Sequence, residues 1–353
     1  MRALVAGHLC IDFFPTLDRQ PGLEEGALYA IGPMQARCGG SVYTTGVTLA
    51  RLGVEVQLAA AVGNDLLAGL LTQLLRAEEL DTTQFAVANT STSYSIVTQA
   101  PGRDRTFWHH VGANEAFDGS GLDLAGVDVL HVGYPSLLRR MCEDDGQRLV
   151  DLFRRARALG CTTSLDLAVV DTGDPGRVRR WSRFLERVLP VTDIVTPSVD
   201  DLSSALEWVP ADPLDVQREQ AERLLAWGCA VVLLTAGASG LLVATADAGR
   251  LSSTGRLAPL LQSHACMRHL EEAVPVEHVD GTTGAGDVAT AGFLAGLMQG
   301  EGPVAAARLA ALAAARHVAG VPPCAQGDDA TPAAPRATAV RQERTTGHHG
   351  GIS

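Results

Sequence analysis

Apolar residues recur along the chain in two spacings, and their alternation predicts the fold class. Short apolar runs of strand length are separated by longer segments in which apolar residues lie three or four positions apart, the spacing of an amphipathic helix. The strand-like runs are 2–11, 54–62, 128–132, 162–167, 193–196 and 230–234, and the main helix-like segments are 41–52, 66–75, 144–159, 177–188, 214–227, 289–297 and 303–319. Strands that alternate with helices form a parallel sheet with right-handed crossovers. We therefore expect an α/β fold, a three-layer α/β/α domain around a central, mostly parallel sheet.

Two regions follow a different pattern and predict a second, smaller sheet. Residues 84–110 alternate between apolar and polar positions around the turn P-G-R-D at 101–104, which is typical of a β-hairpin. Residues 14–37 are interrupted by prolines and glycines, so they favour loops and short strands over helix. We expect the segments from about 13–38 and 84–112 to form a small β-sheet beside the main domain, called the lid below.

Polar side chains stand where three of the predicted strands end. Asp12 follows the first strand, Ser198 follows the strand 193–196, and Thr235 follows the strand 230–234. Ligands of parallel α/β sheets bind at the carboxyl ends of the strands. The three residues are therefore candidates for a ligand site at one edge of the sheet.

The stretch 279–297, V-D-G-T-T-G-A-G-D-V-A-T-A-G-F-L-A-G-L, joins a glycine-rich loop to a helix of small residues. The glycines allow tight turns, and Thr282 or Thr283 can supply a side-chain oxygen or an N-cap. The first amides of the helix have no internal partner and carry the positive end of the helix dipole, so the loop is suited to bind an anion. Asp287, in the first turn, can accept a proton from an attacking hydroxyl, as phosphoryl transfer requires. Spacing alone equally allows Asp287 to complement only the helix dipole.

The charged residues narrow the classes of function. The chain has 353 residues, enough for one large domain or two ordinary ones, and its net charge of −12 argues against nucleic acid and an anionic membrane as partners. All 28 basic residues are arginine. The absence of lysine excludes a Walker A lysine, a protein-kinase strand lysine and a Schiff base. An anionic substrate must be held by helix ends, arginines or metal ions.

The cysteines and the two ends of the chain indicate the compartment and the domain limits. The seven cysteines are scattered without a C-x-x-C, which suits a reducing cytoplasm and gives no zinc spacing. The apolar N terminus lacks a clear signal-cleavage site, and no apolar run reaches the ~18 residues of a membrane helix, so we expect a cytoplasmic protein. The composition changes to Gly, Pro, Ala and Thr near residue 325, which predicts a folded domain over 1–324 and a disordered tail over 325–353.

The run T-T-G-A-G-D at 282–287, followed by an apolar helix, closely resembles the signature of the ribokinase-like (PfkB-type) carbohydrate kinases. The resemblance continues, in the family's order, over roughly residues 2–320. It implies a ribokinase-like fold with a β-sheet lid and an enzyme that transfers a phosphoryl group from ATP to an alcohol. The residues carried over are the catalytic base, Asp287, and the anion hole, Gly284, Ala285 and Gly286. The family usually reads D-T-T-G, whereas here Gly281 intervenes after Asp280.

Further segments of the resemblance concern the acceptor. G-H-L-C-I-D at 7–12 matches the opening strand whose terminal aspartate holds sugar hydroxyls, and a carboxylate can accept two such hydrogen bonds. C-G-G-S-V-Y-T-T-G at 38–46 matches the first signature, with a threonine where the family usually has asparagine. The hairpin tail 103–115 matches a subset of these kinases, although a plain hairpin with solvent-facing polar groups explains it as well. The predicted acceptor residues are Asp12, Gly39, Gly40, Thr44, Arg105, His109 and Asn114.

Two segments concern the nucleotide and its metal ion. P-S-V-D-D at 197–201 falls where the family carries N-x-x-E, which helps to place magnesium and phosphates through waters. Here Ser198 replaces the asparagine, and Asp201 keeps the carboxylate that Mg²⁺ prefers. L-T-A-G-A-S-G at 234–240 matches the nucleotide-side strand and turn. The predicted nucleotide-binding residues are Ser198, Thr235, Gly237, Gly240 and Thr283, and the predicted metal residue, acting through water, is Asp201.

We therefore predict a kinase that uses ATP and Mg²⁺ to phosphorylate a hydroxyl of a small sugar or sugar acid. The resemblance also admits a monovalent cation, and the exposed edge of the lid sheet is suited to a homodimer. Two alternatives remain open: a nucleoside kinase of the adenosine kinase type, and a sugar- or nucleotide-binding sensor without activity on the same fold. Activity assays with a panel of sugar and nucleoside acceptors distinguish a sugar kinase from a nucleoside kinase. The intact G-A-G-D argues against the sensor.

Overall fold

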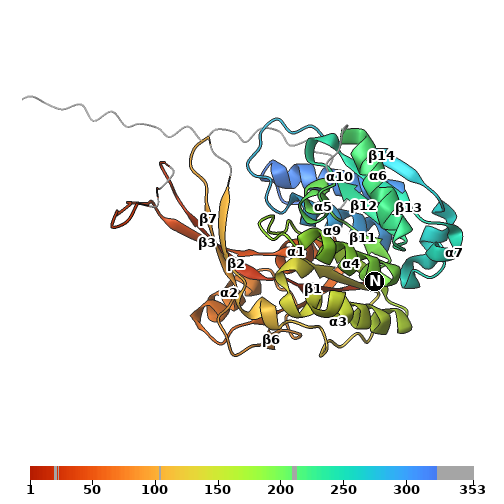
Figure 1. Cartoon of the computed structure of the whole chain (residues 1–353), viewed down its shortest axis with the longest axis horizontal. Helices are drawn as coiled ribbons and strands as arrows, with labels where there is room; N and C mark the ends of the chain where they lie inside the picture. Colours follow the sequence, from red (N-terminus) through yellow and green to blue (C-terminus); the bar gives the residue numbers. More distant parts are fainter. Residues whose placement is uncertain (20–21, 23, 103–104, 209–212, 324–353) are drawn as a thin grey trace, which may run out of the picture.

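The structure is a computed structural model, and it describes residues 1–19, 22, 24–102, 105–208 and 213–323. The expected tail 325–353 and the turn residues Arg103 and Asp104 lie outside the described residues. The described chain forms a large sheet covered by helices and a small sheet that stands to one side of it (Figure 1).

The main sheet has eight strands, and most of its pairs are parallel. Its order is β14-β13-β12-β11-β10-β9-β1-β4, in which β13 runs antiparallel to both of its neighbours. The strands are β14 (Arg268–Glu271), β13 (Leu241–Thr245), β12 (Val231–Thr235), β11 (Ile194–Val195), β10 (Thr162–Asp166), β9 (Val129–Gly133), β1 (Arg2–Gly7) and β4 (Glu55–Ala59). The expected central, mostly parallel sheet is confirmed.

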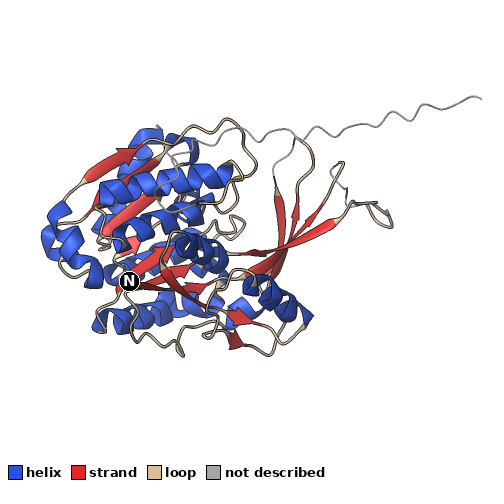
Figure 2. Ribbon diagram, turned by 180° about the vertical axis from the view of Figure 1, so that it is seen from behind, coloured by secondary structure: helices blue, strands red, loops and turns tan. Residues whose placement is uncertain are grey.

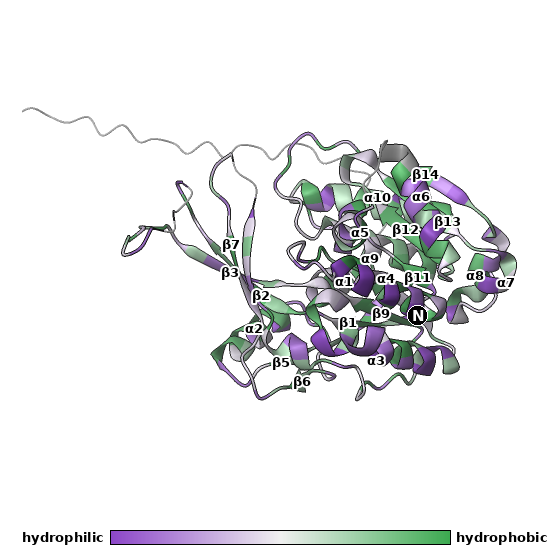
Figure 3. Ribbon diagram, in the orientation of Figure 1, coloured by the Kyte–Doolittle hydropathy of each residue, from purple (hydrophilic) through white to green (hydrophobic). Residues whose placement is uncertain are grey.

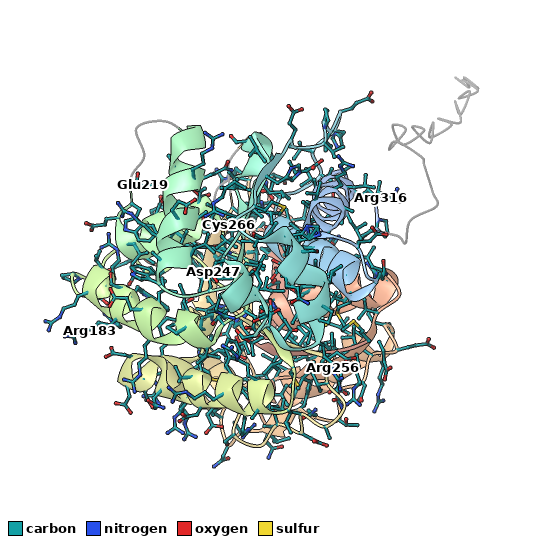
Figure 4. The ribbon with its side chains drawn as sticks, turned by 90° about the vertical axis from the view of Figure 1, so that its right-hand side faces the viewer. Arg183, Glu219, Asp247, Arg256, Cys266 and Arg316 are labelled. Atoms are coloured by element: carbon teal, nitrogen blue, oxygen red, sulfur yellow. The ribbon has the colours of Figure 1, made fainter. Side chains whose placement is uncertain are left out.

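Alternate residues of the strands enter two apolar cores, one on each face of the sheet. In β1, Val5 enters the first core and Leu4 enters the second. The helices that contribute to the first core are α1 (Ser41–Arg51), α2 (Leu66–Arg76), α7 (Ala248–Leu251), α8 (Ala258–Leu261), α9 (Ala285–Met298) and α10 (Pro303–Val318). The helices that contribute to the second core are α3 (Arg139–Ala158), α4 (Arg177–Val188), α5 (Val199–Leu206) and α6 (Pro213–Ala226). The inner strands are coloured as hydrophobic in Figure 3, whereas Arg183 of α4 and Glu219 of α6 are exposed at the surface in Figure 4.

Helix α9 is buried almost all round and packs closely on α10. Gly292 and Gly296 lie one turn apart, and a Cβ added at either position would come within 2.8 Å of the Cα of Ala310 or Ala306 in α10. The small residues of both helices therefore let the two backbones approach each other. This packing fixes the position of α9 and, with it, the residues of its first turn.

The lid is a separate four-stranded sheet in the order β3-β2-β7-β8, seen from both sides in Figures 1 and 2. Its strands are β3 (Met34–Gly39), β2 (Cys10–Pro15), β7 (Tyr94–Thr98) and β8 (Thr106–His110). The pair β2–β7 is parallel, and the other two pairs are antiparallel. The segments expected to form the lid do supply this sheet, except that β6 (Ala86–Val87) pairs instead with β5 (Ala61–Val62).

The first predicted strand, 2–11, is wrong in one respect, because it is two strands in two different sheets. Strand β1 ends at Gly7, and the chain then enters the lid as β2, with Asp12 inside that strand rather than at an end. Gly7 has a φ of 129°, and a Cβ there would lie 2.3 Å from the carbonyl oxygen of Gly133. Only glycine fits this crossing. The apolar run hides the crossing because both strands are buried.

Two further boundaries differ from the prediction. The strand expected at 54–62 divides at Ala60 into β4 of the main sheet and β5 of the small pair. The helix expected from residue 144 begins at Arg139, and its backbone is non-helical from Glu143 to Gly146. In the part of the chain that the structure describes, no helix is both long and apolar enough to cross a membrane.

Candidate active site

The carboxyl ends of the parallel strands bring polar side chains together along one edge of the main sheet. In the order of the sheet these are Thr235 at the end of β12, Ser198 after β11, Asp166 at the end of β10, Tyr134 after β9 and His8 after β1. Neighbouring ends are linked directly, because Thr235 bridges to Ser198 and the amide of Tyr134 donates to the carbonyl of Asp166. This edge is where ligands of α/β sheets bind.

Asp287 lies in the first turn of α9 and is only 2% exposed. The hydroxyl of Tyr134 donates to its Oδ2 at 2.8 Å, and the hydroxyl of Thr45 donates to its Oδ1 at 3.4 Å. Burial raises the pKa of Asp287 to about 7; the charge of Asp201 adds to the rise, and the two hydrogen bonds oppose it. A carboxylate with a pKa near the working pH is suited to act as a general base.

Asp166 is a site residue that the sequence patterns do not single out. It is 4% exposed, and burial, together with the charges of Asp287 and Asp201, raises its pKa well above the usual range. Burial likewise raises the pKa of Asp201. Three buried carboxylates therefore share one region. The signal that could find Asp166 is its place, because it is an acid at the end of a buried strand.

The N terminus of α9 has no side-chain cap. Its N-cap residue is Gly284, with a φ of 80°, so neither Thr282 nor Thr283 takes that position. The amide of Ala285 donates to the carbonyl of Thr282 at 3.2 Å. The first amides of a helix have no partner within it and face the segment before it, an arrangement that is suited to bind anions.

Two distant side chains hold this loop. His317, on α10, makes a hydrogen bond of 2.6 Å between its Nε2 and the carbonyl of Thr283. Arg105, in the lid just before β8, donates to the hydroxyl of Thr282 at 2.5 Å. The lid therefore already reaches the loop that precedes α9.

The N-terminal turns of α1 lie against the same loop and against the crossing from β1. Gly40 caps α1 with a φ of 89°, and a Cβ there would lie 2.6 Å from the carbonyl oxygen of His8. Thr44 packs against Gly284, where a Cβ would lie 3.1 Å from the Thr44 methyl group. The next residue, Thr45, is the one that contacts the carboxylate of α9. The predicted Thr44 thus neighbours the anion loop, and the sequence patterns miss Thr45.

Asp12 is closely surrounded inside the lid. A Cβ added at Gly39 of β3 would lie 2.0 Å from its Oδ2, so the glycine makes room for the carboxylate. The side chain accepts hydrogen bonds from Ser95 of β7 and from Cys10, whose Sγ lies 3.3 Å from Oδ1. Burial raises the pKa of Asp12, and these bonds and the charge of His109 oppose the rise.

His109 connects the lid to the main domain, whereas Asn114 binds the backbone of the segment that joins β1 to β2. The Nδ1 of His109 lies 3.0 Å from Ser95 Oγ, and its Nε2 lies 3.3 Å from Nε2 of His8. Asn114 is fully buried, and its amide pairs with the backbone N–H and C=O of Leu9 at 3.3 and 3.0 Å. Both ends of the Asn114 amide are thus used to hold the crossing from β1 to β2.

Ser198 and Asp201 form the start of α5. The amide of Asp201 donates to Ser198 Oγ at 3.0 Å, and the amide of Ser198 donates to Asp201 Oδ2 at 2.8 Å, a reciprocal capping box. The box uses one carboxylate oxygen of Asp201. Among the described residues, no group of three or more His, Cys, Asp or Glu side chains has the arrangement of a metal site.

The turn after β12 is shaped by glycines. Gly237 has a φ of 54° and Gly240 a φ of 83°. A Cβ at Gly240 would lie 2.2 Å from the carbonyl oxygen of Glu271, so this position excludes every larger residue. Both predicted glycines therefore form the turn that leads from Thr235 into β13.

The structure thus brings the predicted residues into two groups. One group, around Asp287, combines a buried carboxylate with helix amides and acids from the sheet edge, which suits phosphoryl transfer. The other group, around Asp12, combines a carboxylate, a hydroxyl and an imidazole in the lid, which suits hydroxyl groups of a ligand. His8 lies between the two groups, next to His109 on one side and Tyr134 on the other.

Comparison with known proteins identifies the family. The model of the pfkB family carbohydrate kinases matches residues 2–321. The chain is similar to a fructokinase of Rhizobium leguminosarum bv. trifolii, with 24% identity over 302 residues that cover 83% of this chain and 79% of the fructokinase.

Two solved structures have a similar fold. The ribokinase of Arabidopsis thaliana, complexed with ribose and ATP, has a TM-score of 0.68 at 17% identity and covers 90% of this chain and 92% of its own. The adenosine kinase of Sinorhizobium meliloti has a TM-score of 0.68 at 22% identity, and the match covers 92% of this chain and 96% of the adenosine kinase. The expected ribokinase-like fold with its small β-sheet is confirmed. Because the family model spans almost the whole described chain, the protein belongs to the pfkB family of carbohydrate kinases.

Proposed function

We propose that the enzyme transfers the terminal phosphoryl group of ATP to a hydroxyl of a small, neutral sugar. The observation that carries the proposal is a buried aspartate, Asp287, in the uncapped first turn of α9, with a pKa of about 7. A base of this strength is largely ionised at slightly alkaline pH and can still hold a proton once it has accepted one. The neighbouring helix amides supply the positive potential that the reaction requires.

Asp287 accepts the proton of the acceptor hydroxyl as that oxygen attacks phosphorus. Its Oδ2 is held by Tyr134 at 2.8 Å, whereas the bond of Thr45 to Oδ1 is long, at 3.4 Å. Oδ1 is therefore the oxygen that can exchange its partner for the acceptor hydroxyl. The amides of Gly284 and Gly286, and that of Ala285 once it is released from the carbonyl of Thr282, stabilise the charge on the transferred group.

The acids of the sheet edge fit a magnesium ion that keeps much of its water shell. Mg²⁺ prefers carboxylate oxygens and is usually bound by one or two of them together with waters and phosphates. Asp201 and Asp166 are such carboxylates; burial raises the pKa of both, with neighbouring acids adding to the rise, and a cation would favour their ionised forms. When bound, Mg²⁺ would neutralise the charge of the nucleotide phosphates. The family resemblance also admits a monovalent cation.

The nucleotide side is proposed from the adjoining strand ends. Ser198 and Thr235 are bridged to each other, and the turn with Gly237 and Gly240 follows directly. Glycines at this turn allow a ligand to approach the backbone closely. Thr283, in the loop before α9, would lie on the phosphate side.

The acceptor side is proposed from the lid. Asp12, Ser95 and His109 offer acceptors and donors that match vicinal hydroxyls. Gly39 and Gly40 leave room beside them. The carboxylate of Asp12 favours a neutral polyol over a sugar acid because it would repel an acidic substrate, whose charge would have to be met by Arg105.

The lid is proposed to close over the acceptor and exclude water, without which ATP would be hydrolysed. We further propose that two lids pair in a homodimer. Strands β3 and β8 are the edges of the lid sheet, and Met34, Phe107 and Trp108 on them are 49%, 49% and 46% exposed. Apolar side chains on an edge strand favour association. A monomeric mass in light scattering would contradict this part.

A reducing cytoplasm is the compartment that we propose. Within the described residues, the six cysteines Cys10, Cys38, Cys142, Cys161, Cys229 and Cys266 are free. Proteins of oxidising compartments more often pair their cysteines. Fractionation of cells that express the full chain would test the assignment.

The decisive experiment measures ADP formation from Mg-ATP with a panel of neutral pentoses and hexoses, sugar acids and nucleosides. The matched control is Asp287→Asn, which we expect to fold, to bind ATP and to turn over roughly 10²–10⁴-fold more slowly. Near-normal turnover in that variant would refute the role of the base. Turnover confined to nucleosides would favour a nucleoside kinase, and no turnover with stabilisation by a sugar or ATP would favour a sensor.

A further inference from the structure

Tyr134 is placed against the reacting centre by an unusual backbone. It follows β9 directly, and its φ of 60° and ψ of 53° are left-handed, a conformation that bulky residues rarely adopt. The conformation turns its side chain from the sheet edge to Asp287, to which its hydroxyl donates at 2.8 Å. A left-handed tyrosine is retained only where the surrounding structure compensates for the strain.

The ring of Tyr134 also has a partner that leads to the lid. It stacks on the imidazole of His8, with centroids 5.9 Å apart and an interplanar angle of 28°. His8 in turn lies against His109 of the lid, with the two Nε2 atoms 3.3 Å apart. Burial lowers the pKa of His8 to about 3, so this imidazole is neutral and one of the two Nε2 atoms donates to the other. Two ring contacts thus join the lid to the tyrosine that holds the carboxylate.

Building on the proposed function, we propose that Tyr134 is a positioning residue for the base: it fixes Oδ2 of Asp287 and couples that carboxylate to the lid through His8 and His109. With Oδ2 held, Oδ1 faces the acceptor. A lid that moves His109 displaces the stack and the hydroxyl with it. The base is therefore aligned only when the lid is in place.

The groups that face Asp287 come from every element around it. They are Tyr134 after β9, Asp166 at the end of β10, Asp201 on α5 and Thr45 on α1, while His317 of α10 contacts the carbonyl of Thr283 in the loop before the helix. The carboxylates favour the protonated base, whereas the tyrosine hydroxyl favours the ionised base because it donates to the charged form. Thr45 acts in the same direction, but its hydrogen bond is longer, at 3.4 Å against 2.8 Å for Tyr134, so loss of the tyrosine hydroxyl is the change that moves the base further towards protonation.

The test is the pH profile of kcat/KM for Tyr134→Phe, in the full chain with the acceptor that the panel identifies. This profile reports the ionisation of the free enzyme. We expect its acidic limb to move to higher pH by roughly one to two units, because a hydrogen bond to a charged group has about that effect. At pH 6 kcat/KM should fall by roughly 10–100-fold and at pH 9 it should approach the unmodified enzyme. The KM for ATP should stay unchanged.

The matched control is Tyr43→Phe. Tyr43, on α1, also donates to a carboxylate at 3.0 Å, but its hydroxyl is bound to Glu78, which follows α2, and not to Asp287. Its pH profile should equal that of the unmodified enzyme. If Tyr134→Phe does not fold, fluorotyrosine at position 134 keeps the ring shape and donates more strongly, so the acidic limb should move to lower pH.

Three outcomes overturn the proposal. If the acidic limb of the pH profile does not move in Tyr134→Phe, or if it moves to higher pH with fluorotyrosine, then the hydrogen bond of Tyr134 does not set the ionisation of Asp287. A lower KM for the acceptor with an unmoved limb shows that the hydroxyl merely occupies the acceptor's place. If Asp287→Asn is fully active, the proposed function fails; if that variant is inactive and Tyr134→Phe has an unmoved limb, only this inference fails.

Discussion

Replacing the buried Asp287 with asparagine should stabilise the fold, and the gain should depend on pH. Asp287 is 2% exposed, and its pKa in the folded protein is about 7 instead of 3.8. A rise of about three units corresponds to about 4 kcal/mol, at about 1.4 kcal/mol per unit, by which ionisation disfavours the folded state. Asparagine carries no charge, so it removes this cost of ionisation. Its side-chain oxygen can still accept the hydrogen bond of Tyr134 while its NH₂ group donates to Thr45.

The sign follows from the protons bound in each state. Between pH 4 and pH 7 the folded protein keeps a proton on Asp287 that the unfolded chain has released, so stability falls as the pH rises through this window. The penalty is complete above about pH 7. Asp287→Asn should therefore gain roughly 2–4 kcal/mol at pH 8, seen as several degrees in Tm, and little at pH 4.

The assay is thermal and guanidinium unfolding of both proteins at pH 4.5 and pH 8, without nucleotide or Mg²⁺. Asp118→Asn is a control of opposite sign, because Asp118 is partly exposed and hydrogen bonds from Ser120 and the charges of Arg148 and Arg140 lower its pKa. That variant should lose stability at pH 8, and its deficit should shrink on acidification. A gain for Asp287→Asn that is equal at both pH values would refute the reasoning, since it would not come from ionisation.

Three further predictions concern packing and caps. Gly39→Ala places a methyl group 2.0 Å from Oδ2 of Asp12, so it should raise the KM for the acceptor roughly tenfold or more, equivalent to about 1.4 kcal/mol, in steady-state assays. The control is Gly69→Ala on α2, where an added Cβ would have no atom within 4 Å and the KM should stay unchanged. Ser198→Ala removes the cap of α5 and should lower the free energy of unfolding by about 1 kcal/mol in guanidinium titrations; unchanged stability would argue against the capping box. Gly292→Ala forces a Cβ to within 2.8 Å of the α10 backbone and should cost about 1–3 kcal/mol in the same titration, whereas a stabilised variant would show that the two helices can separate freely.

The periodicity of the sequence was sufficient for the architecture because it is local. Strand and helix spacings are set by the geometry of each element, so alternating runs predicted a parallel sheet with helices on both faces. The same holds for the loop before α9, where glycines and an acid occur together in a few residues. The position of Asp287 in the first turn of the helix could be predicted from that stretch alone, whereas the structure shows that Gly284, and neither threonine, is the N-cap residue.

Long-range packing decided what the periodicity left open. The crossing at Gly7 depends on Gly133, more than a hundred residues away, so the strand 2–11 looked continuous in the sequence. Thr45, rather than its neighbour Thr44, contacts the base because the rotation of α1 is set by its packing on α9.

Local patterns in the chain were therefore enough to predict the fold class, the small sheet and a glycine-rich loop that leads into a helix with an acid in its first turn. The tertiary structure alone decided which side chains surround that acid. Asp166 and Tyr134 follow different strands, and only the order of the strands in the sheet makes them neighbours of Asp287. Burial among these groups, which no local pattern encodes, is what raises the pKa of an ordinary aspartate into the range of a base.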